Sequence, residues 1–351
     1  MLDLTEMRST LAGQYDLAPS MRLAEDMADT HAKMARVMPL ADFARHAPYI
    51  RAINALKREK NAVILAHNYM TPDIYHGVAD VVGDSLQLAI EATKVEAEII
   101  VQGGVHFMAE TSKILNPAKT VLIPDMQAGC SLAESITADG IAEMRAKYPG
   151  APVVSYVNTT AEVKAASDIC CTSSNAAQIV AAQDSDVVIM TPDQYLAQNV
   201  AREVPQKKVV WWEGSCIVHE QYTKDDINAF REMNPDTRII AHPECPPDVV
   251  DASDFSGSTS GIIDYVTREK PGKAMLVTEC SMASNISDAL PEVEFTGPCN
   301  MCPYMKKITL EKILWSLHTG TQAVEVDPQI AAKAKIAVER MIEQKILPFW
   351  V

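Results

Sequence analysis

The strongest constraint on the fold is a pattern of apolar runs and helical stretches that occurs three times along the chain. Each copy has three apolar, β-rich runs separated by helical-looking segments, and the third run leads to a cysteine. Apolar strands without polar alternation, separated by helices, are typical of parallel sheets buried on both faces. The pattern predicts three small α/β units, with strands in 62–69, 97–104 and 120–130, in 152–160, 185–193 and 207–216, and in 238–245, 273–280 and 292–302.

Turn residues after helical stretches suggest where the units meet. "KYPGAP" lies near residue 150 and "MNPDT" near residue 237, and Pro and Gly interrupt helices at such points. We expect an N-terminal helical extension over 1–48 and αβα repeats over 49–150, 151–237 and 238–351, the last with C-terminal helices. The alternative is that the regularity is only that of an ordinary α/β protein.

The spacing of three cysteines favours a true triplication. Cys130, Cys216 and Cys302 each follow the third apolar run of a copy and lie 86 residues apart. Equivalent positions in three copies of one unit would be related by an approximate threefold axis, so the three sulfurs would converge. Converging thiolates repel each other unless a cation neutralises them, which predicts a metal. The alternative for each cysteine is a small buried apolar side chain.

The cysteines alone leave the kind of metal centre open. Zinc could take three thiolates and a water, as in a zinc-dependent aldolase or hydrolase. A 4Fe-4S cluster on three cysteines would keep one iron open as a Lewis acid. Cys299 could replace Cys302 as a ligand or pair with it, and such a pair would suit a redox sensor or scaffold. We expect the others to be packed or incidental: Cys170, Cys171, Cys245 and Cys280.

Polar residues gather where the first strands end and helices begin. Ligands of parallel α/β sheets bind at the carboxyl ends of strands, where helix N-termini offer free N–H groups to anions. Glu244 and Tyr69 could exchange protons with one substrate. Ser85 and Ser173 could equally be helix N-caps. The candidate residues are His67, Tyr69, Ser85, Tyr156, Asn158, Ser173, His242, Glu244, Ser258 and Thr259.

Charge and composition narrow the partners. The formal net charge of −15 and the lack of a basic patch argue against nucleic acid, which is bound mainly through clustered Lys and Arg. No stretch approaches the roughly 18 apolar residues of a membrane span, and the first residues lack the pattern of a signal peptide. We therefore expect a cytoplasmic protein that binds neither nucleic acid nor membrane.

Several motifs resemble one known family. "LAHNY", "GDSLQLA", "FMAETSKILNP", "YVNTTAEVKAASDICCTSSNA", "HPECPPDVVDASDFSGSTSG" and "PYMKKITLEKIL" occur in order between about residue 60 and residue 318. Together they are similar to the quinolinate synthase (NadA) family. The resemblance implies three similar αβα domains with pseudo-threefold symmetry around a 4Fe-4S cluster, with Cys130, Cys216 and Cys302 as its ligands.

The resemblance also implies an activity. Members of the family condense iminoaspartate with dihydroxyacetone phosphate to quinolinate, phosphate and water in NAD biosynthesis, which suggests a functional link to the enzyme that supplies iminoaspartate. Tyr69, Glu244 and His242 match catalytic positions. His219, three residues after the ligand Cys216, is expected to approach the cavity. Substrate-binding positions fall on His67, Ser85, Tyr156, Asn158, Ser173, His242, Glu244, Ser258 and Thr259. The N-terminal extension, the Cys170 and Cys171 doublet and Cys299 depart from the family pattern.

Overall fold

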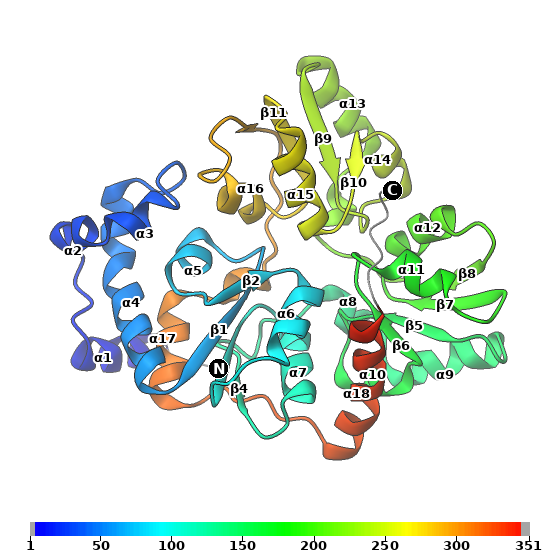
Figure 1. The fold of residues 1–351 in the computed structure, drawn as a ribbon, viewed down its shortest axis with the longest axis horizontal. Coiled ribbons are helices and arrows are strands. Elements are labelled where there is room, and N and C mark those ends of the chain that lie inside the picture. Colours follow the sequence, from blue (N-terminus) through cyan, green and yellow to red (C-terminus); the bar gives the residue numbers. More distant parts are fainter. Residues whose placement is uncertain (1–3, 345–351) are drawn as a thin grey trace.

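Three small sheets, each flanked by helices, surround a common centre (Figure 1). The computed structural model describes residues 4–344. The chain passes through the three units in turn, so the first, second and third sheets follow one another in sequence and in the picture. The predicted α/β class, with three similar αβα units and an N-terminal helical segment, is confirmed.

The three sheets have the same topology. Each is parallel and four-stranded, and its first strand lies between its second and third strands. The strands of the first sheet are β1 (Ala62–His67), β2 (Val81–Gly83), β3 (Ile99–Gly103) and β4 (Thr120–Leu122). Those of the second are β5 (Val153–Tyr156), β6 (Ile169–Cys171), β7 (Val187–Thr191) and β8 (Lys208–Trp211), and those of the third are β9 (Thr237–Ala241), β10 (Phe255–Ser256), β11 (Lys273–Val277) and β12 (Glu294–Phe295).

The short second strand of each unit was not predicted. β2, β6 and β10 are two or three residues long, and each pairs with the edge of the unit's first strand. A run this short has no periodicity of its own, so only the neighbouring strand makes it a strand. These edge strands bring the hydroxyl-rich segments that follow them to the carboxyl edge of each sheet.

Helices cover both faces of the sheets. The N-terminal segment holds α1 (Leu4–Gln14), α2 (Met21–Asp26), α3 (Ala28–Ala32) and α4 (Leu40–Glu59). The first unit contains α5 (Pro72–Gly77), α6 (Ser85–Ala92), α7 (His106–Leu115), α8 (Ser131–Ser135) and α9 (Ala138–Lys147). The second contains α10 (Ala161–Ala166), α11 (Ala176–Ala181), α12 (Gln194–Glu203), η1 (His219–Gln221) and α13 (Lys224–Met233). The third contains α14 (Pro247–Asp251), α15 (Thr259–Glu269), α16 (Ser281–Ile286) and η2 (Met305–Lys307), followed by α17 (Leu310–Thr319) and α18 (Pro328–Glu343).

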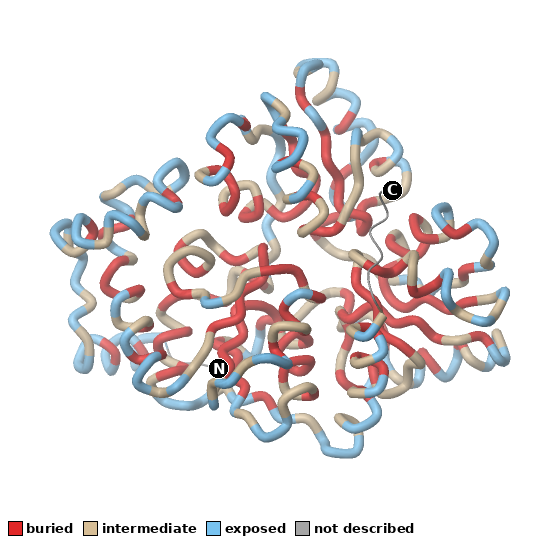
Figure 2. Tube along the Cα trace, viewed as in Figure 1, coloured by how far each residue is buried: buried red, intermediate tan, exposed pale blue. Residues whose placement is uncertain are grey.

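The core explains why the strands read as unbroken apolar runs. In the third sheet, Ile240 and Leu276 face one apolar cluster, while Ile239 and Met275 face another on the opposite side. Strands buried on both faces need apolar residues at every position rather than at alternate ones. Figure 2 shows the strands as buried cores within shells of partly exposed helices.

The last two helices leave the third unit. α17 packs beside α4, and α18 packs against α10 and β6 of the second unit (Figure 1). The domain limits at residues 48, 150 and 237 stay a prediction. Among the described residues, no helix combines the length and apolar character needed to cross a membrane.

Candidate active site

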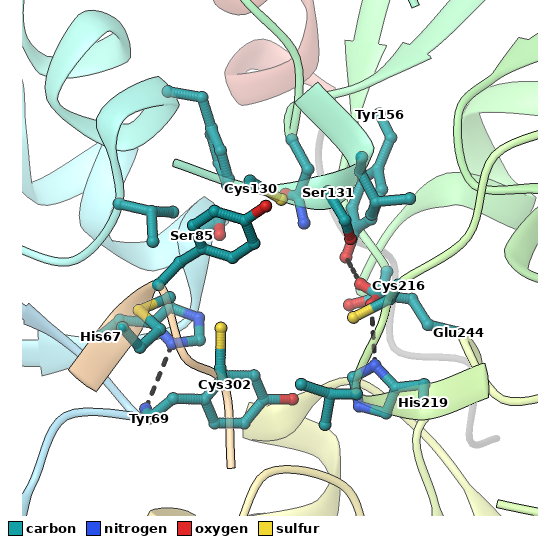
Figure 3. Close-up of a pocket in the computed structure, with 18 of the residues that line it drawn as sticks. His67, Tyr69, Ser85, Cys130, Ser131, Tyr156, Cys216, His219, Glu244 and Cys302 are labelled. Atoms are coloured by element: carbon teal, nitrogen blue, oxygen red, sulfur yellow. Dashed lines mark hydrogen bonds and ion pairs between the residues drawn. The ribbon is translucent and has the colours of Figure 1, made fainter. Parts of the chain in front are cut away.

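A cavity lies where the three units meet. It holds about 710 Å³ of space, including its opening to solvent, and every unit contributes to its wall. Figure 3 shows the labelled side chains around this space. Its lining includes the three equally spaced cysteines and the strand-end residues His67, Tyr69, Tyr156, Asn158, His242 and Glu244. The convergence predicted from the repeat is therefore present.

The three cysteine sulfurs share one local geometry. Cys130 precedes α8, and Cys216 and Cys302 come shortly before η1 and η2. Each sulfur accepts hydrogen bonds from the backbone N–H groups two and three residues further along, which come from Leu132 and Ala133, Val218 and His219, and Tyr304 and Met305. The sulfurs point into the same space (Figure 3), and all three are free of disulfides.

Protein surroundings keep these thiols from ionising by themselves. Burial raises the pKa of Cys130 to about 12, raises that of Cys216 well above its usual range and raises that of Cys302. The backbone N–H groups lower each pKa, so they oppose part of this effect. Three buried sulfurs with prepared N–H donors need a cationic centre to become thiolates, and this donor set fits a metal–sulfur group.

A continuous chain of hydrogen bonds crosses one side of the cavity. The Tyr69 hydroxyl lies 2.6 Å from Thr278 Oγ1, which lies 2.9 Å from His219 Nε2. His219 Nδ1 lies 2.9 Å from Glu244 Oε2, and the Tyr156 hydroxyl donates to Glu244 Oε1 over 2.5 Å. Tyr69 and Glu244, which the sequence paired as proton-transfer candidates, are thus joined through two intervening side chains.

The electrostatics of this side of the cavity keep Glu244 charged and two histidines neutral. Burial opposes ionisation of Glu244, but His242, His219 and hydrogen bonds from His219 and Tyr156 hold its pKa below the usual value. Burial lowers the pKa of His242 to about 3 and that of His67 to about 4. Burial and the Glu244 charge raise the pKa of Tyr69 and Tyr156 well above normal.

Most of the predicted binding residues line the cavity, but Ser258 does not. Ser258 caps α15, where its hydroxyl accepts the Gly261 N–H over 3.2 Å, and Thr259 beside it reaches the lining. Ser85 is the first residue of α6, whose cap is Asp84 rather than Ser85. Ser173 is not a helix cap either; its side chain hydrogen-bonds with Tyr156.

The predictions from the sequence did not include Thr278 and Asp84, and they gave His219 no role. Thr278 follows β11 in a segment with no special motif, and only its contacts mark it. His219, three residues after Cys216, was expected near the cavity but without a role. Asp84 bridges two units, because it caps α6 and accepts the Ser174 hydroxyl over 2.8 Å. A fully conventional signal, an Asp immediately before a helix, could have identified it.

The remaining cysteines differ in part from expectation. Cys299 is bonded to Cys280, so neither of its proposed roles, ligand in place of Cys302 or partner of Cys302, matches its position. Cys280 was expected to be packed or incidental and is instead the partner in this bond. Cys170, Cys171 and Cys245 are free and buried.

Comparisons with known proteins agree with the resemblance. Residues 51–343 match the family model described as quinolinate synthetase A protein. The chain is 58% identical over 330 residues to the quinolinate synthase of Sinorhizobium fredii, covering 94% of this chain and 92% of that one. It is 58% identical over 293 residues to that of Xylella fastidiosa, covering 84% and 86%, and 56% identical over 301 residues to that of Caulobacter vibrioides, covering 85% and 82%.

Proposed function

The chain belongs to the quinolinate synthase family, and we propose that it condenses iminoaspartate with dihydroxyacetone phosphate to quinolinate, phosphate and water in NAD biosynthesis. The observation that carries this proposal is the convergence of three equivalent cysteines, each with the same pair of N–H donors, on one cavity. A cytoplasmic location and a functional link to the enzyme that supplies iminoaspartate belong to the same proposal.

Cys130, Cys216 and Cys302 would hold a 4Fe-4S cluster. With one cysteine ligand from each unit, such a cluster would keep one iron without a protein sulfur ligand. When bound, the cluster supplies a Lewis-acidic iron that assists loss of water from a hydroxyl group. Burial disfavours negative charge on the three sulfurs, and the backbone N–H groups beside them stabilise that charge.

Neutral donors would bind the anionic substrates. None of the described residues that line the cavity is Lys or Arg, so phosphate and carboxylate groups must be held by hydroxyls, amides and helix N-termini. α6 and α15 begin at the cavity with Ser85 and Thr259. Asn158 Oδ1 is buried and has no hydrogen-bond partner within residues 4–344, which suits a substrate N–H or O–H. Ser258, which lies outside the lining, would act through its cap of α15, the helix that brings Thr259 to the cavity.

The hydrogen-bonded chain would move a proton to and from Tyr69. Because ionised Glu244 can only accept, His219 carries its proton on Nδ1, and its Nε2 is left to accept from Thr278. Thr278 can then take the proton of Tyr69 as it passes its own to His219. The resulting phenolate could abstract a substrate proton, and Glu244 would stabilise the imidazolium. His242, stacked on His219 with ring centroids 4.6 Å apart, would hold that ring in place.

A zinc-dependent aldolase or hydrolase is the second candidate. Cys216, His219 and Glu244 offer ligand atoms that all lie within 4.8 Å of one another. A zinc ion there would have to break the hydrogen bond between His219 and Glu244 and would use only one of the three equivalent sulfurs. The iron–sulfur assignment uses all three sulfurs and leaves the hydrogen-bonded chain intact, so we favour it over zinc at Cys216, His219 and Glu244. Zinc on the three thiolates with a water is the form of this candidate that metal analysis decides.

Metal and sulfide analysis tests the proposal directly. The protein purified without oxygen should contain about four iron and four sulfide per chain, absorb broadly near about 400 nm, and form quinolinate from the two substrates. Cys216→Ser should lose most of the iron and all turnover. Cys170→Ser, at a buried free cysteine outside the cavity, is the matched control and should keep both. A colourless protein with one zinc would overturn the proposal in favour of the second candidate.

A further inference from the structure

Lys306 lies four residues after Cys302, and its ammonium group meets three acceptors. Its Nζ donates to the Tyr69 carbonyl over 2.9 Å, to Ser281 Oγ over 2.6 Å, and to Glu279 Oε1 over 2.7 Å. These acceptors come from the loop after β1 and from the segment after β11, so one cation joins the first unit to the third. An ammonium group has three protons, and each is used here.

Glu279 is the buried partner of this cation. Its side chain is 0% exposed, whereas that of Lys306 is 21% exposed. Glu279 Oε1 also accepts the Cys302 N–H over 3.4 Å, and its Oε2 accepts the Ser281 N–H over 2.8 Å. The carboxylate therefore holds the backbone of a proposed cluster ligand. A buried carboxylate without its cation is strongly unfavourable, so the two residues act as a unit.

The second unit has the carboxylate but not the cation. Asp193 lies 86 residues before Glu279, the same interval that separates Cys216 from Cys302, and its Oδ2 accepts the Cys216 N–H over 3.1 Å. The corresponding position of the first unit is Phe107. Asp193 forms no ion pair among the described residues, so the lysine is an addition specific to the third unit. The third unit is also the one whose Thr278 contacts the Tyr69 hydroxyl.

The loop that carries Tyr69 is held by the third unit at three consecutive carbonyls. Asn285 Nδ2 donates to the carbonyls of Asn68 and Met70 over 2.9 and 2.8 Å. Lys306 Nζ donates to the carbonyl of Tyr69, which lies between these two residues. The side chain of Tyr69 meets Thr278, the residue immediately before Glu279. The ion pair thus contacts the backbone of both Tyr69 and Cys302. Glu279 also directly follows Thr278, the proposed proton acceptor of Tyr69.

We infer that Glu279 and Lys306 are a positioning pair that fixes the Cys302 loop and Tyr69 relative to each other. The pair aligns the third cysteine ligand with the first group of the proton-transfer chain across the boundary between two units. This inference rests on the proposed function. Reacting groups must be placed to within about 1 Å for full activity, so loosening this contact affects turnover more than substrate binding.

Lys306→Met tests the pair, with Lys312→Met as its matched control. Lys312 lies on the same segment and donates to Asp125 over 2.6 Å, with both side chains 15% exposed, but neither residue lines the cavity. Lys306→Met should lower kcat roughly 10- to 100-fold with KM changed less than about threefold, and release iron to a ferrous chelator roughly tenfold faster. Lys312 Nζ also donates to the Lys307 carbonyl over 2.8 Å, but none of its contacts involves Tyr69, Glu279 or Cys302. Lys312→Met should therefore leave kcat, KM and iron release within about twofold of wild type.

Two further measurements separate positioning from simple loss of stability. Glu279→Gln/Lys306→Met removes both charges, so it should recover thermal stability lost in Lys306→Met while kcat stays low. Hydrogen exchange of the full chain should be faster at the Cys302 and Ser281 amides in Lys306→Met and unchanged there in Lys312→Met. The inference is overturned if Lys306→Met keeps kcat and iron release near wild type, or if the double variant restores kcat. A wild-type protein that makes no quinolinate would instead refute the proposed function, and hydrogen exchange would still decide the pair.

Discussion

Thr278 is the residue on which the proposed proton path depends most directly. Among the described residues, its hydroxyl is the only one that connects Tyr69 and His219 by hydrogen bonds. Thr278→Val keeps the shape of the side chain and removes the hydroxyl, so Tyr69 loses its proton acceptor. We expect kcat to fall about 10²- to 10⁴-fold, with little change in KM, because the substrate contacts remain. Steady-state quinolinate formation measures both parameters.

Thr237→Val is the control for that substitution. Thr237 is also buried, but its Oγ1 has no hydrogen-bond partner in the part of the chain that the structure describes. Replacing an unsatisfied hydroxyl with a methyl group should be neutral or stabilising, and kcat should not change. Equal losses of kcat in both variants would rule out the assigned role of Thr278.

Two histidines should make opposite contributions to the pH dependence of stability. Burial lowers the pKa of His67 to about 4. Between roughly pH 6.5 and 4 the unfolded chain therefore binds a proton that the folded chain does not, so the stability of the fold decreases as the pH is lowered. A hydrogen bond to Asp73 raises the pKa of His46. Its stabilisation is fully present below roughly pH 6.5 and is lost as pH rises through the raised value.

Thermal unfolding at pH 5.5 and 8.5 checks these signs. The melting temperature of His67→Gln relative to that of wild type should be higher at pH 5.5 than at pH 8.5, because the variant lacks the penalty of a histidine kept neutral. The melting temperature of His46→Gln relative to that of wild type should be lower at pH 5.5 than at pH 8.5, because wild type has the charged pair at pH 5.5. A shift of both variants in the same direction would contradict the assignment of one of the two pKa directions.

At the scale of elements, the start of α6 connects capping with binding. Asp84 Oδ1 accepts the Gln87 N–H over 2.9 Å, and the other oxygen accepts the Ser174 hydroxyl of the second unit. Asp84→Ala should cost about 1 kcal/mol of stability through the lost cap. Because Asp84 and Ser85 at the start of α6 line the cavity, KM for dihydroxyacetone phosphate should rise roughly fivefold to tenfold.

Asp327→Ala is the matched cap variant. Asp327 Oδ1 caps α18 through the N–H groups of Gln329 and Ile330, at 2.8 and 3.2 Å, and lies outside the cavity lining. It should lower the melting temperature to a similar extent and leave KM unchanged. If both variants raised KM alike, the effect of Asp84 would be one of stability and not of the α6 terminus.

At the scale of the whole molecule, α18 holds the units together from the end of the chain. It packs against α10 and β6 of the second unit and α7 of the first, and Met341 is fully buried in the largest apolar cluster. Met341→Ala should cost about 2–5 kcal/mol through the cavity it leaves. Met233, which is 74% exposed, provides the control, and Met233→Ala should not alter the melting temperature. A negligible effect of Met341→Ala would show that α18 is not needed for stability.

The sequence by itself determined what repeats. Unbroken apolar runs predicted the parallel sheets, and the interval of 86 residues predicted that Cys130, Cys216 and Cys302 would meet, because equivalent positions in repeated units are related by rotation. The strand-end polar residues followed from the same logic, since the carboxyl ends of parallel strands share one edge.

Only the tertiary structure decided what lies between the units. The contacts of Thr278 with Tyr69, of Asp84 with Ser174 and of Lys306 with Tyr69 join residues from different units. The pairing of Cys299 with Cys280 and the two- or three-residue edge strands likewise depend on neighbours distant in sequence. Periodicity reports which face of a strand or helix is buried, but it carries no information on which side chains a second unit brings against it.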